Sequence, residues 1–190
     1  MLALALLAVG GLMFLPELGQ DKDIESHGGR HAEIAREMAQ SRQYVVPVCL
    51  GTVYTMKPPL YHWAAALMYN LTGTVDFRSA RLPSALACMA SAVAIFILGC
   101  RWFNVRAGFL SGLMYLCFPL IAIWGRHARM DALMAAGITG VILFCALAAG
   151  SRRGVAVWAW WVLAWLCVAA AILAKGLSAI FFVAVAAPLV

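Results

Sequence analysis

Cationic side chains lie at the ends of apolar segments in this sequence, where they could bind a phosphate group or an anionic lipid. Lys57 precedes two prolines, Arg126 and Arg129 separate two apolar segments, and Lys175 interrupts a long apolar stretch. Ionisable groups at membrane depth are costly and often mark a function. Lys57 could instead lie along an interface with its stem buried, and Lys175 could be a simple turn charge. Arg126 and Arg129 could form an interfacial salt bridge with Asp131.

Carboxylates and histidines gather between residues 17 and 81, and only one acidic residue, Asp131, lies outside this stretch. Glu25, His27 and His31 could hold a divalent metal ion, although the two glycines between the histidines disfavour a helical i,i+4 geometry. The alternative is a polar surface near lipid headgroups. A divalent metal is therefore a possible cofactor, and no residue is assigned as a metal ligand.

The composition indicates a membrane protein. Hydrophobic residues make up 65% of the chain and charged residues 12%, and the mean hydropathy is +0.90, far from the balance of a soluble domain. The formal charge is +6, but the basic residues lie between apolar runs rather than along one polar face, which argues against a nucleic-acid partner. The six cysteines show no metal-ligand spacing and are interpreted as small apolar side chains.

Apolar segments of about spanning length predict an all-α integral membrane protein. The first is read as a membrane helix rather than a signal peptide, because no basic region precedes it. The last reaches Val190 without a flanking charge, so we expect residues 1–190 to be the N-terminal part of one longer membrane domain. The predicted segments are 2–15, 82–99, 107–124, 132–149, 155–174 and 177–190, with a loop over 17–81.

Arginines in two short connections favour an orientation for this bundle. Arg101 with Arg106 and Arg152 with Arg153 fall on one side by helix parity, and basic short loops are typically cytoplasmic. The opposite side has more basic residues in total, but there they are mixed with nearly all of the carboxylates. We therefore expect the loop over 17–81 to be external.

The loop itself is expected to contain two helices that lie on the membrane surface. Residues 30–41 have the pattern of an amphipathic helix. Pro58 and Pro59 suit the start of a second helix, in which Tyr61 and His62 belong to an aromatic belt at headgroup level. With an extended stretch over 44–56 between them, these juxtamembrane helices would form a platform beneath which a lipid headgroup could bind.

Six short motifs occur in a fixed order along this hydrophobic pattern: RHAEIAREM (30–38), YVVP (44–47), KPPLYHW (57–63), ARLPS (80–84), RHARMD (126–131) and AKG (174–176). Together they resemble the glycosyltransferases of the ArnT and protein O-mannosyltransferase type. The resemblance covers about residues 25–190. It implies a GT-C fold, a catalytic first external loop, and a sugar donor attached to a polyprenyl phosphate.

Two positions depart from this family's pattern. Its members usually have an Asp-Glu pair just before the first motif, where this chain has His27 and Gly28, and ArnT-type members commonly have an acidic residue at the position of Met56. Glu25 could supply the missing carboxylate. The expected catalytic group is accordingly Glu25, His27, Arg30 and Glu33.

Transfer from a lipid phosphate needs a base for the acceptor and cations for the leaving phosphate. With the resemblance, Lys57, Arg126, Arg129 and Lys175 are interpreted as ligands of the donor phosphate, and Glu25 as the base. The supporting residues are Arg81, Asp131, Tyr61 and His62. For Arg81 the alternative is an interfacial anchor, and Arg30 could instead brace Glu33 at i,i+3.

The sequence therefore predicts a glycosyltransferase of the bacterial inner membrane, which moves a sugar from a polyprenyl-phosphate donor to an envelope lipid, glycan or protein on the external side. Its expected partners are that donor and membrane lipids, with no nucleic acid. The alternative is a membrane transporter or lipid-phosphate-binding protein without transfer chemistry, for which the missing Asp-Glu pair is the main argument.

Overall fold

The structure is a computed structural model that describes residues 1–19, 26–151 and 154–186. In this part of the chain almost all regular structure is helical, which confirms the predicted all-α class. The elements are α1 (Leu2–Phe14), the 3-10 turn η1 (Leu15–Glu17), α2 (Ser26–Ser41), β1 (Val48–Cys49), β2 (Thr52–Val53), α3 (Leu60–Thr72), α4 (Phe77–Trp102), α5 (Val105–Cys117), α6 (Pro119–Arg126), α7 (Met130–Ala149), α8 (Val155–Lys175) and α9 (Ser178–Ala186).

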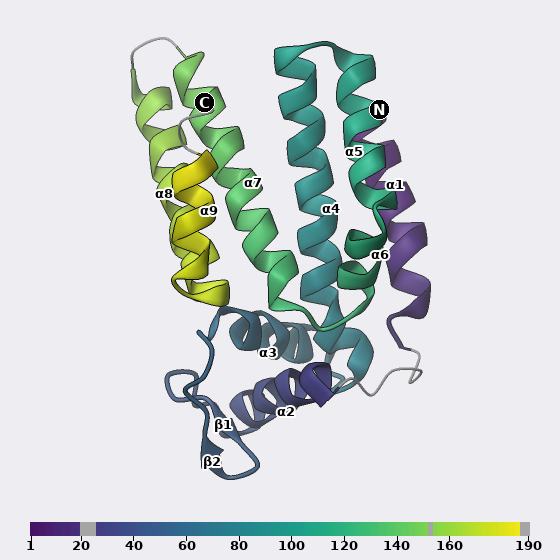
Figure 1. Cartoon of the computed structure of the whole chain (residues 1–190). Coiled ribbons are helices and arrows are strands. Elements are labelled where there is room, and N and C mark those ends of the chain that lie inside the picture. Colours follow the sequence, from purple (N-terminus) through teal and green to yellow (C-terminus); the bar gives the residue numbers. More distant parts are fainter. Residues whose placement is uncertain (20–25, 152–153, 187–190) are drawn as a thin grey trace.

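The molecule has two parts, a helix bundle and a platform across one end of it (Figure 1). The helices α4, α7 and α8 are each long and apolar enough to cross a membrane, and the bent pair of α5 and α6 makes a fourth candidate span. The platform consists of α2, α3 and the β1–β2 hairpin, and both the α6–α7 connection and the α8–α9 turn lie at the same end (Figure 1).

The segment predicted over 107–124 is not one straight helix. It is divided into α5 and α6, whose axes differ by 64°. Phe118, between them, has an extended backbone with φ −66° and ψ 127°, and Pro119 is the first residue of α6. A residue before proline avoids the helical region, and proline suits a first helical position, so the bend follows from this pair.

Helix α4 begins at Phe77 rather than near residue 82. The Asp76 carboxylate caps it by accepting a hydrogen bond from the Ser79 backbone N–H at 2.7 Å, as expected for an N-cap aspartate. Pro83 lies inside the helix. The predicted loop is therefore shorter than expected, and Arg81 belongs to a helix.

Helix α2 begins at Ser26 rather than at residue 30, so the glycines at 28 and 29 are helical. We expected these glycines to disfavour a helical i,i+4 spacing of His27 and His31, but the backbone has this spacing. A Cβ on Gly28 would lie 3.7 Å from the Ala128 Cβ, an ordinary van der Waals distance, so the packing at this position does not require a glycine. Gly28 therefore lies against the α6–α7 connection.

The platform has a core of its own between α2 and α3. Ile34, Ala35 and Met38 of α2 are buried against Tyr61 and other residues of α3. The opposite face of α3 is exposed at Leu67 and Leu71. The expectation that Tyr61 and His62 form an aromatic belt at headgroup level is wrong, because both side chains are fully buried and point into this core.

The stretch predicted as extended, 44–56, contains the β1–β2 hairpin, in which Val48 pairs with Val53. Leu50 and Gly51 have φ values of 52° and 77°, as a tight two-residue hairpin turn requires. The Glu37 carboxylate accepts a hydrogen bond from the Leu50 N–H at 2.6 Å, which ties the turn to α2.

Candidate functional site

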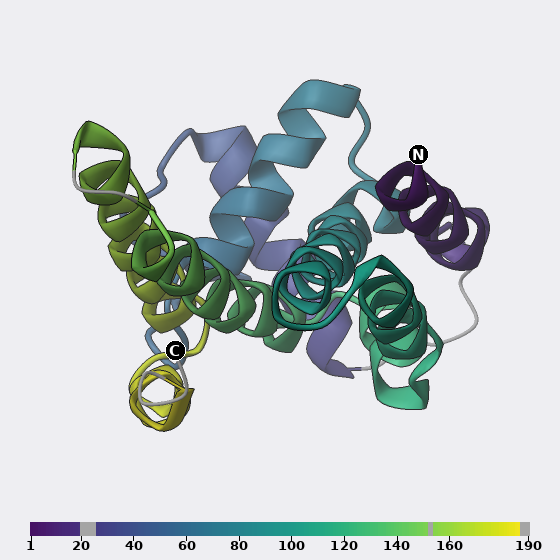
Figure 2. The same cartoon turned by 90° about the horizontal axis from the view of Figure 1, so that it is seen from above.

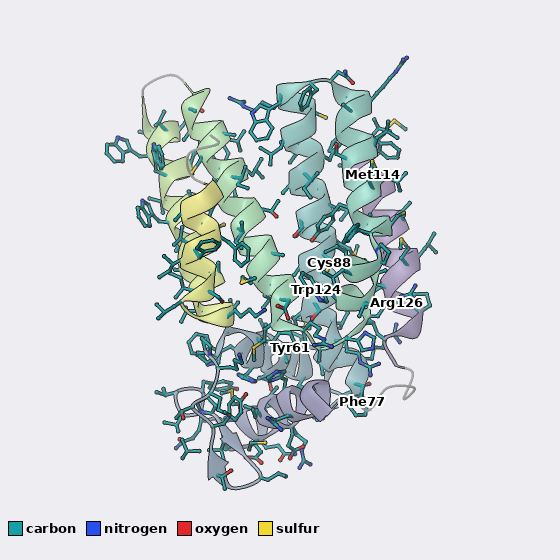
Figure 3. The ribbon with its side chains drawn as sticks, viewed as in Figure 1. Tyr61, Phe77, Cys88, Met114, Trp124 and Arg126 are labelled. Atoms are coloured by element: carbon teal, nitrogen blue, oxygen red, sulfur yellow. The ribbon has the colours of Figure 1, made fainter. Side chains whose placement is uncertain are left out.

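Three segments that are far apart in sequence meet where the platform joins the bundle. The start of α3 lies against the α8–α9 turn, since a Cβ on Gly176 would be 3.7 Å from the Pro58 Cγ. The α6–α7 connection packs into the same region, because Ala128 and Met130 belong to the platform core with Tyr61. Tyr61 lies at this junction in Figure 3. Most of the predicted site residues therefore share one end of the bundle.

Asp131 and Lys175 form an ion pair across this junction. Asp131 is in the first turn of α7 and Lys175 is the last residue of α8, and the Lys175 ammonium donates to the Asp131 carboxylate. Both side chains are partly buried. The partner that the structure gives for Asp131 is Lys175, whereas the alternative interpretation of the sequence paired Asp131 with Arg126 or Arg129. This pairing reduces the charge that Lys175 can offer a phosphate.

Lys57 lies just before α3 and is exposed. It makes no hydrogen bond or ion pair with any residue in the described part of the chain. Helix α3 begins after Pro59 without a side-chain cap, so the N-cap side chain accepts no hydrogen bond from the N–H groups of its first turn. An uncapped helix N-terminus beside a lysine is favourable for a phosphate group.

The arginines of the α6–α7 connection are bound to neighbouring helices. The Arg126 Nε donates to the Met13 carbonyl at 3.1 Å, which joins the end of α6 to α1; Figure 3 labels Arg126 at this end of α6. The backbone N–H of Arg129 donates to the Ser84 hydroxyl at 3.0 Å, and that hydroxyl donates to the Arg129 carbonyl at 3.1 Å. Ser84 therefore fixes the point at which α7 begins.

Arg81 is not an interfacial anchor, because its side chain is buried within the bundle end. Its Nη1 donates to the Leu18 carbonyl at 2.9 Å. Its guanidinium also lies 5.3 Å from the centre of the Phe77 ring, a cation–π distance. Arg81 thus binds the segment that follows α1 to helix α4. It has a supporting role and does not contact a lipid headgroup.

Two histidines contact each other inside the platform, and sequence reasoning did not pair them. The His31 Nδ1 and His62 Nε2 are 3.2 Å apart, joining α2 to α3. Burial, with the nearby His31, lowers the pKa of His62 to about 3, so His62 is neutral. The Tyr61 hydroxyl donates to the Ala80 carbonyl at 2.7 Å, and burial raises its pKa. Neither Tyr61 nor His62 is positioned to donate a proton to solvent.

The predicted catalytic group is described only in part. Glu25 lies outside the described residues, and of His27 only the backbone, in the first turn of α2, is described. Arg30 is exposed. Glu33 does not brace Arg30 but pairs with Arg36 at 2.7 Å. This pair lines a surface pocket of about 530 Å³ between α2 and the start of α4.

Comparison with known proteins fits this arrangement. Residues 56–190 match the family described as dolichyl-phosphate-mannose-protein mannosyltransferase. The chain belongs to this family. It is also 30% identical over 161 residues to an undecaprenyl phosphate-alpha-4-amino-4-deoxy-L-arabinose arabinosyl transferase from Shewanella sediminis, which covers 85% of this chain and 28% of that protein. A transferase of the same description from Aeromonas hydrophila is 35% identical over 106 residues, or 55% of this chain and 19% of that protein.

Two solved structures have the same fold as this chain. The crystal structures of ArnT from Cupriavidus metallidurans, in the apo state and bound to undecaprenyl phosphate, each align with a TM-score of 0.85 and 29% identity. The alignment covers 93% of this chain and 33% of ArnT. The chain thus has the GT-C fold of an integral membrane protein and spans about a third of the length of these relatives.

No group of three or more histidine, cysteine or carboxylate side chains in metal-binding proximity occurs among the described residues. The proposed triad of Glu25, His27 and His31 falls partly outside them. A divalent metal therefore stays a prediction for this member of the family.

Proposed function

We propose that the complete protein transfers a sugar from a polyprenyl-phosphate donor to an envelope lipid, glycan or protein. The observation that supports this proposal is the exposed Lys57 at the uncapped start of α3, where Pro58 lies against Gly176, the residue after Lys175. The family's members act on lipid-linked sugars according to their descriptions, and a solved relative of the same fold holds undecaprenyl phosphate. The sugar and the acceptor are left open.

In this proposal the donor phosphate binds at Lys57. The phosphate oxygens would accept hydrogen bonds from the Lys57 ammonium at the start of α3, where the helix dipole favours an anion. The Asp131–Lys175 pair lies on the neighbouring turn and would hold the Pro58 region against the bundle. Arg126 and Arg129 are further cations of the same end, where their contacts to α1 and α4 fix the α6–α7 connection.

The transfer step requires little covalent chemistry from the protein. The acceptor oxygen or nitrogen forms a bond to the anomeric carbon, the bond from that carbon to the phosphate oxygen breaks, and polyprenyl phosphate leaves. A base takes the acceptor proton, and cations stabilise the charge of the leaving phosphate. We assign Glu25 as the base, with His27, Arg30 and Glu33 on the adjoining helix.

The platform is proposed to face the external side of a bacterial inner membrane. Arg101 and Arg106 lie at the end of the bundle opposite the platform. By the bias of arginine and lysine toward cytoplasmic loops, that end would be cytoplasmic. The transfer would then occur outside the cytoplasm.

Lys57 provides the sharpest test of the phosphate site. In membranes with the complete protein and a radiolabelled polyprenyl-phosphate sugar, Lys57→Ala should lower the transfer rate by about 10- to 100-fold. This is the effect on rate expected from the loss of one charge-assisted hydrogen bond. Lys57→Arg should keep much more of the activity, because it keeps the charge. Arg42→Ala removes an exposed charge elsewhere on the platform and should have no effect. A Lys57→Ala variant with the wild-type rate would exclude this site.

Glu25 is tested separately by Glu25→Gln in the same assay. The substitution removes the base but keeps the size of the side chain, so transfer should fall while binding of polyprenyl phosphate persists. An undiminished rate would remove Glu25 from the mechanism.

A second candidate function is binding of a lipid phosphate without transfer. It is favoured by one observation: His27 and Gly28 stand where the resemblance implies an Asp-Glu pair. In that case the complete protein would bind polyprenyl phosphate through Lys57 and release no sugar from the donor. A transporter without transfer chemistry would instead move the lipid between leaflets of a reconstituted vesicle.

A further inference from the structure

An apolar groove opens at the end of the bundle opposite the platform. Its volume is about 480 Å³. Helix α4, which packs against both α5 and α7, lies between them in the view along the bundle (Figure 2). The groove is lined mainly by the last turns of α4, with contributions from α5 and α7, and it includes Leu98, Trp102, Phe103, Ser111, Thr139 and Ile142.

The two hydroxyl groups in this lining do not make the groove polar. The Ser111 hydroxyl donates to the Ala107 carbonyl at 2.9 Å, and the Thr139 hydroxyl donates to the Ala135 carbonyl at 2.8 Å. Because each is bonded within its own helix, neither donor is directed at a ligand. The groove therefore offers an apolar surface that suits a hydrocarbon chain.

The groove cannot continue between α4 and α5, because these helices touch at their backbones. A Cβ on Gly99 would lie 2.5 Å from the Gly108 Cα. On the other side, the guanidinium of Arg101 extends from the last turn of α4 to the end of α7, where it occupies the space that a Cβ on Gly150 would need. A cation therefore lies at the membrane-surface end of the helices that line the groove.

The charge around this end is entirely positive. Arg101 is exposed, and so is Arg106 in the first turn of α5. The acidic residues that the structure describes, in η1, in α2, just before α4 and in α7, all lie toward the platform, so the described part of this end offers the arginines no carboxylate. The exposed aromatic rings of Trp102 and Phe103 lie beside them, as at a membrane interface.

We propose that the groove binds one acyl chain of an anionic glycerophospholipid, with the phosphate of its headgroup bound by Arg101 and further attracted by the positive charge of Arg106. Basic pockets between membrane helices select anionic headgroups in this way. The positive charge argues for an anionic lipid rather than a zwitterionic one. It also argues against a further apolar helix, which would bring no charge to the arginines. This lipid site lies at the opposite end from Lys57 and does not depend on the proposed transfer.

The first test compares phosphatidylglycerol with phosphatidylcholine of the same acyl chains. Native mass spectrometry of the complete protein in detergent should show retained phosphatidylglycerol at much lower lipid concentration than phosphatidylcholine. The double variant Arg101→Gln/Arg106→Gln should weaken phosphatidylglycerol binding by roughly 30-fold at low ionic strength, with little effect on phosphatidylcholine. Arg42→Gln/Arg78→Gln removes the same charge from the platform end and should bind like the wild type.

The second test fills the groove without changing charge. Ser111→Phe places a ring in the lining at an exposed position, so folding is retained while phosphatidylglycerol binding falls. A photo-reactive residue in place of Thr139 should cross-link to lipid. Equal binding of the two lipids, wild-type binding by the Arg101/Arg106 double variant, or a cross-link to another helix of the protein would each overturn the proposal.

Discussion

Asp131 lies in the first turn of α7 and Lys175 is the last residue of α8, where the bundle meets the platform. The two charges compensate each other in an ion pair. Loss of one partner leaves an uncompensated charge that is partly shielded from water, whereas loss of both leaves none. His31 and His62 are also matched inside the platform, where loss of one ring would leave the nitrogen of the other without this hydrogen-bond partner. At this scale, the stability of the site rests on matched pairs.

The ion pair predicts a strongly non-additive pair of substitutions. Asp131→Asn and Lys175→Met should each lower the free energy of unfolding by about 1–3 kcal/mol, less than a fully buried pair because both side chains retain some exposure. The double variant should recover most of this loss. Thermal unfolding of the four proteins in detergent measures the coupling. Additive losses would mean that the two charges do not stabilise each other.

The histidine pair predicts a pH-dependent platform. The pKa of His62 is lowered from 6.5 to about 3, so between these values the unfolded platform binds more protons than the folded one. The free energy of unfolding should therefore fall as the pH decreases below 6.5, by up to about 1.4 kcal/mol per pH unit. Cysteine accessibility at Cys49 can report platform opening between pH 7.5 and 4.5.

His62→Gln should remove much of that pH dependence, because it removes the imidazole whose protonation is disfavoured in the folded platform. His127→Gln is the matched control: His127 lies at the end of α6, outside the histidine pair, and its loss should leave the dependence intact. An identical pH profile for His62→Gln and wild type would assign the effect to other groups.

At the scale of elements, single residues at the helix ends mark where some of the helices begin. Asp76 as a cap and Pro119 as a helix start are both readable from sequence, and they account for the early start of α4 and the bend between α5 and α6. The helical glycines of α2 were missed because glycine locally disfavours a helix, whereas α2 is stabilised by the burial of its apolar side chains against α3. The all-α membrane class followed from apolar segments of spanning length, whereas the GT-C type followed from the resemblance of the motifs to the family.

Pairings within the site were much less predictable than its elements. His31 and His62 are 31 residues apart, and Asp131 and Lys175 are 44 apart. No local pattern links such positions, since their contact depends on how α2 docks on α3 and how α7 packs against α8. Sequence motifs therefore placed the site residues at one end of the bundle, whereas only the structure shows which of them touch.

The α4–α5 contact predicts a large effect from a small side chain. Gly99→Ala would place a methyl group 2.5 Å from the Gly108 Cα, and backbone cannot yield as a flexible side chain does. The helices should separate, with a loss of about 2 kcal/mol or more in unfolding free energy. Gly11→Ala in α1 meets only the Leu15 side chain at 3.7 Å and should be neutral. Equal unfolding temperatures for the two variants in detergent would contradict this packing.

At the scale of the whole molecule, charge is divided between the two ends. In the described part of the chain, the platform end has the carboxylates together with many cations, and the charged side chains of the opposite end are arginines. From the positive charge of the arginine end we expect two properties. This end faces the cytoplasm, and it attracts anionic lipid. The platform, with its mixed charges and hairpin, would then be the face that meets the acceptor.

Orientation can be read directly from two engineered cysteines in a background without the native ones. Thr52→Cys lies in the exposed platform hairpin, and Val105→Cys lies at the exposed start of α5 at the other end. In intact cells whose outer membrane has been made permeable, a membrane-impermeant maleimide should label Thr52→Cys and leave Val105→Cys unlabelled. After disruption of the inner membrane both should react. Labelling of Val105→Cys alone in intact cells would place the platform, and with it Lys57, on the cytoplasmic face, where the proposed external transfer could not occur.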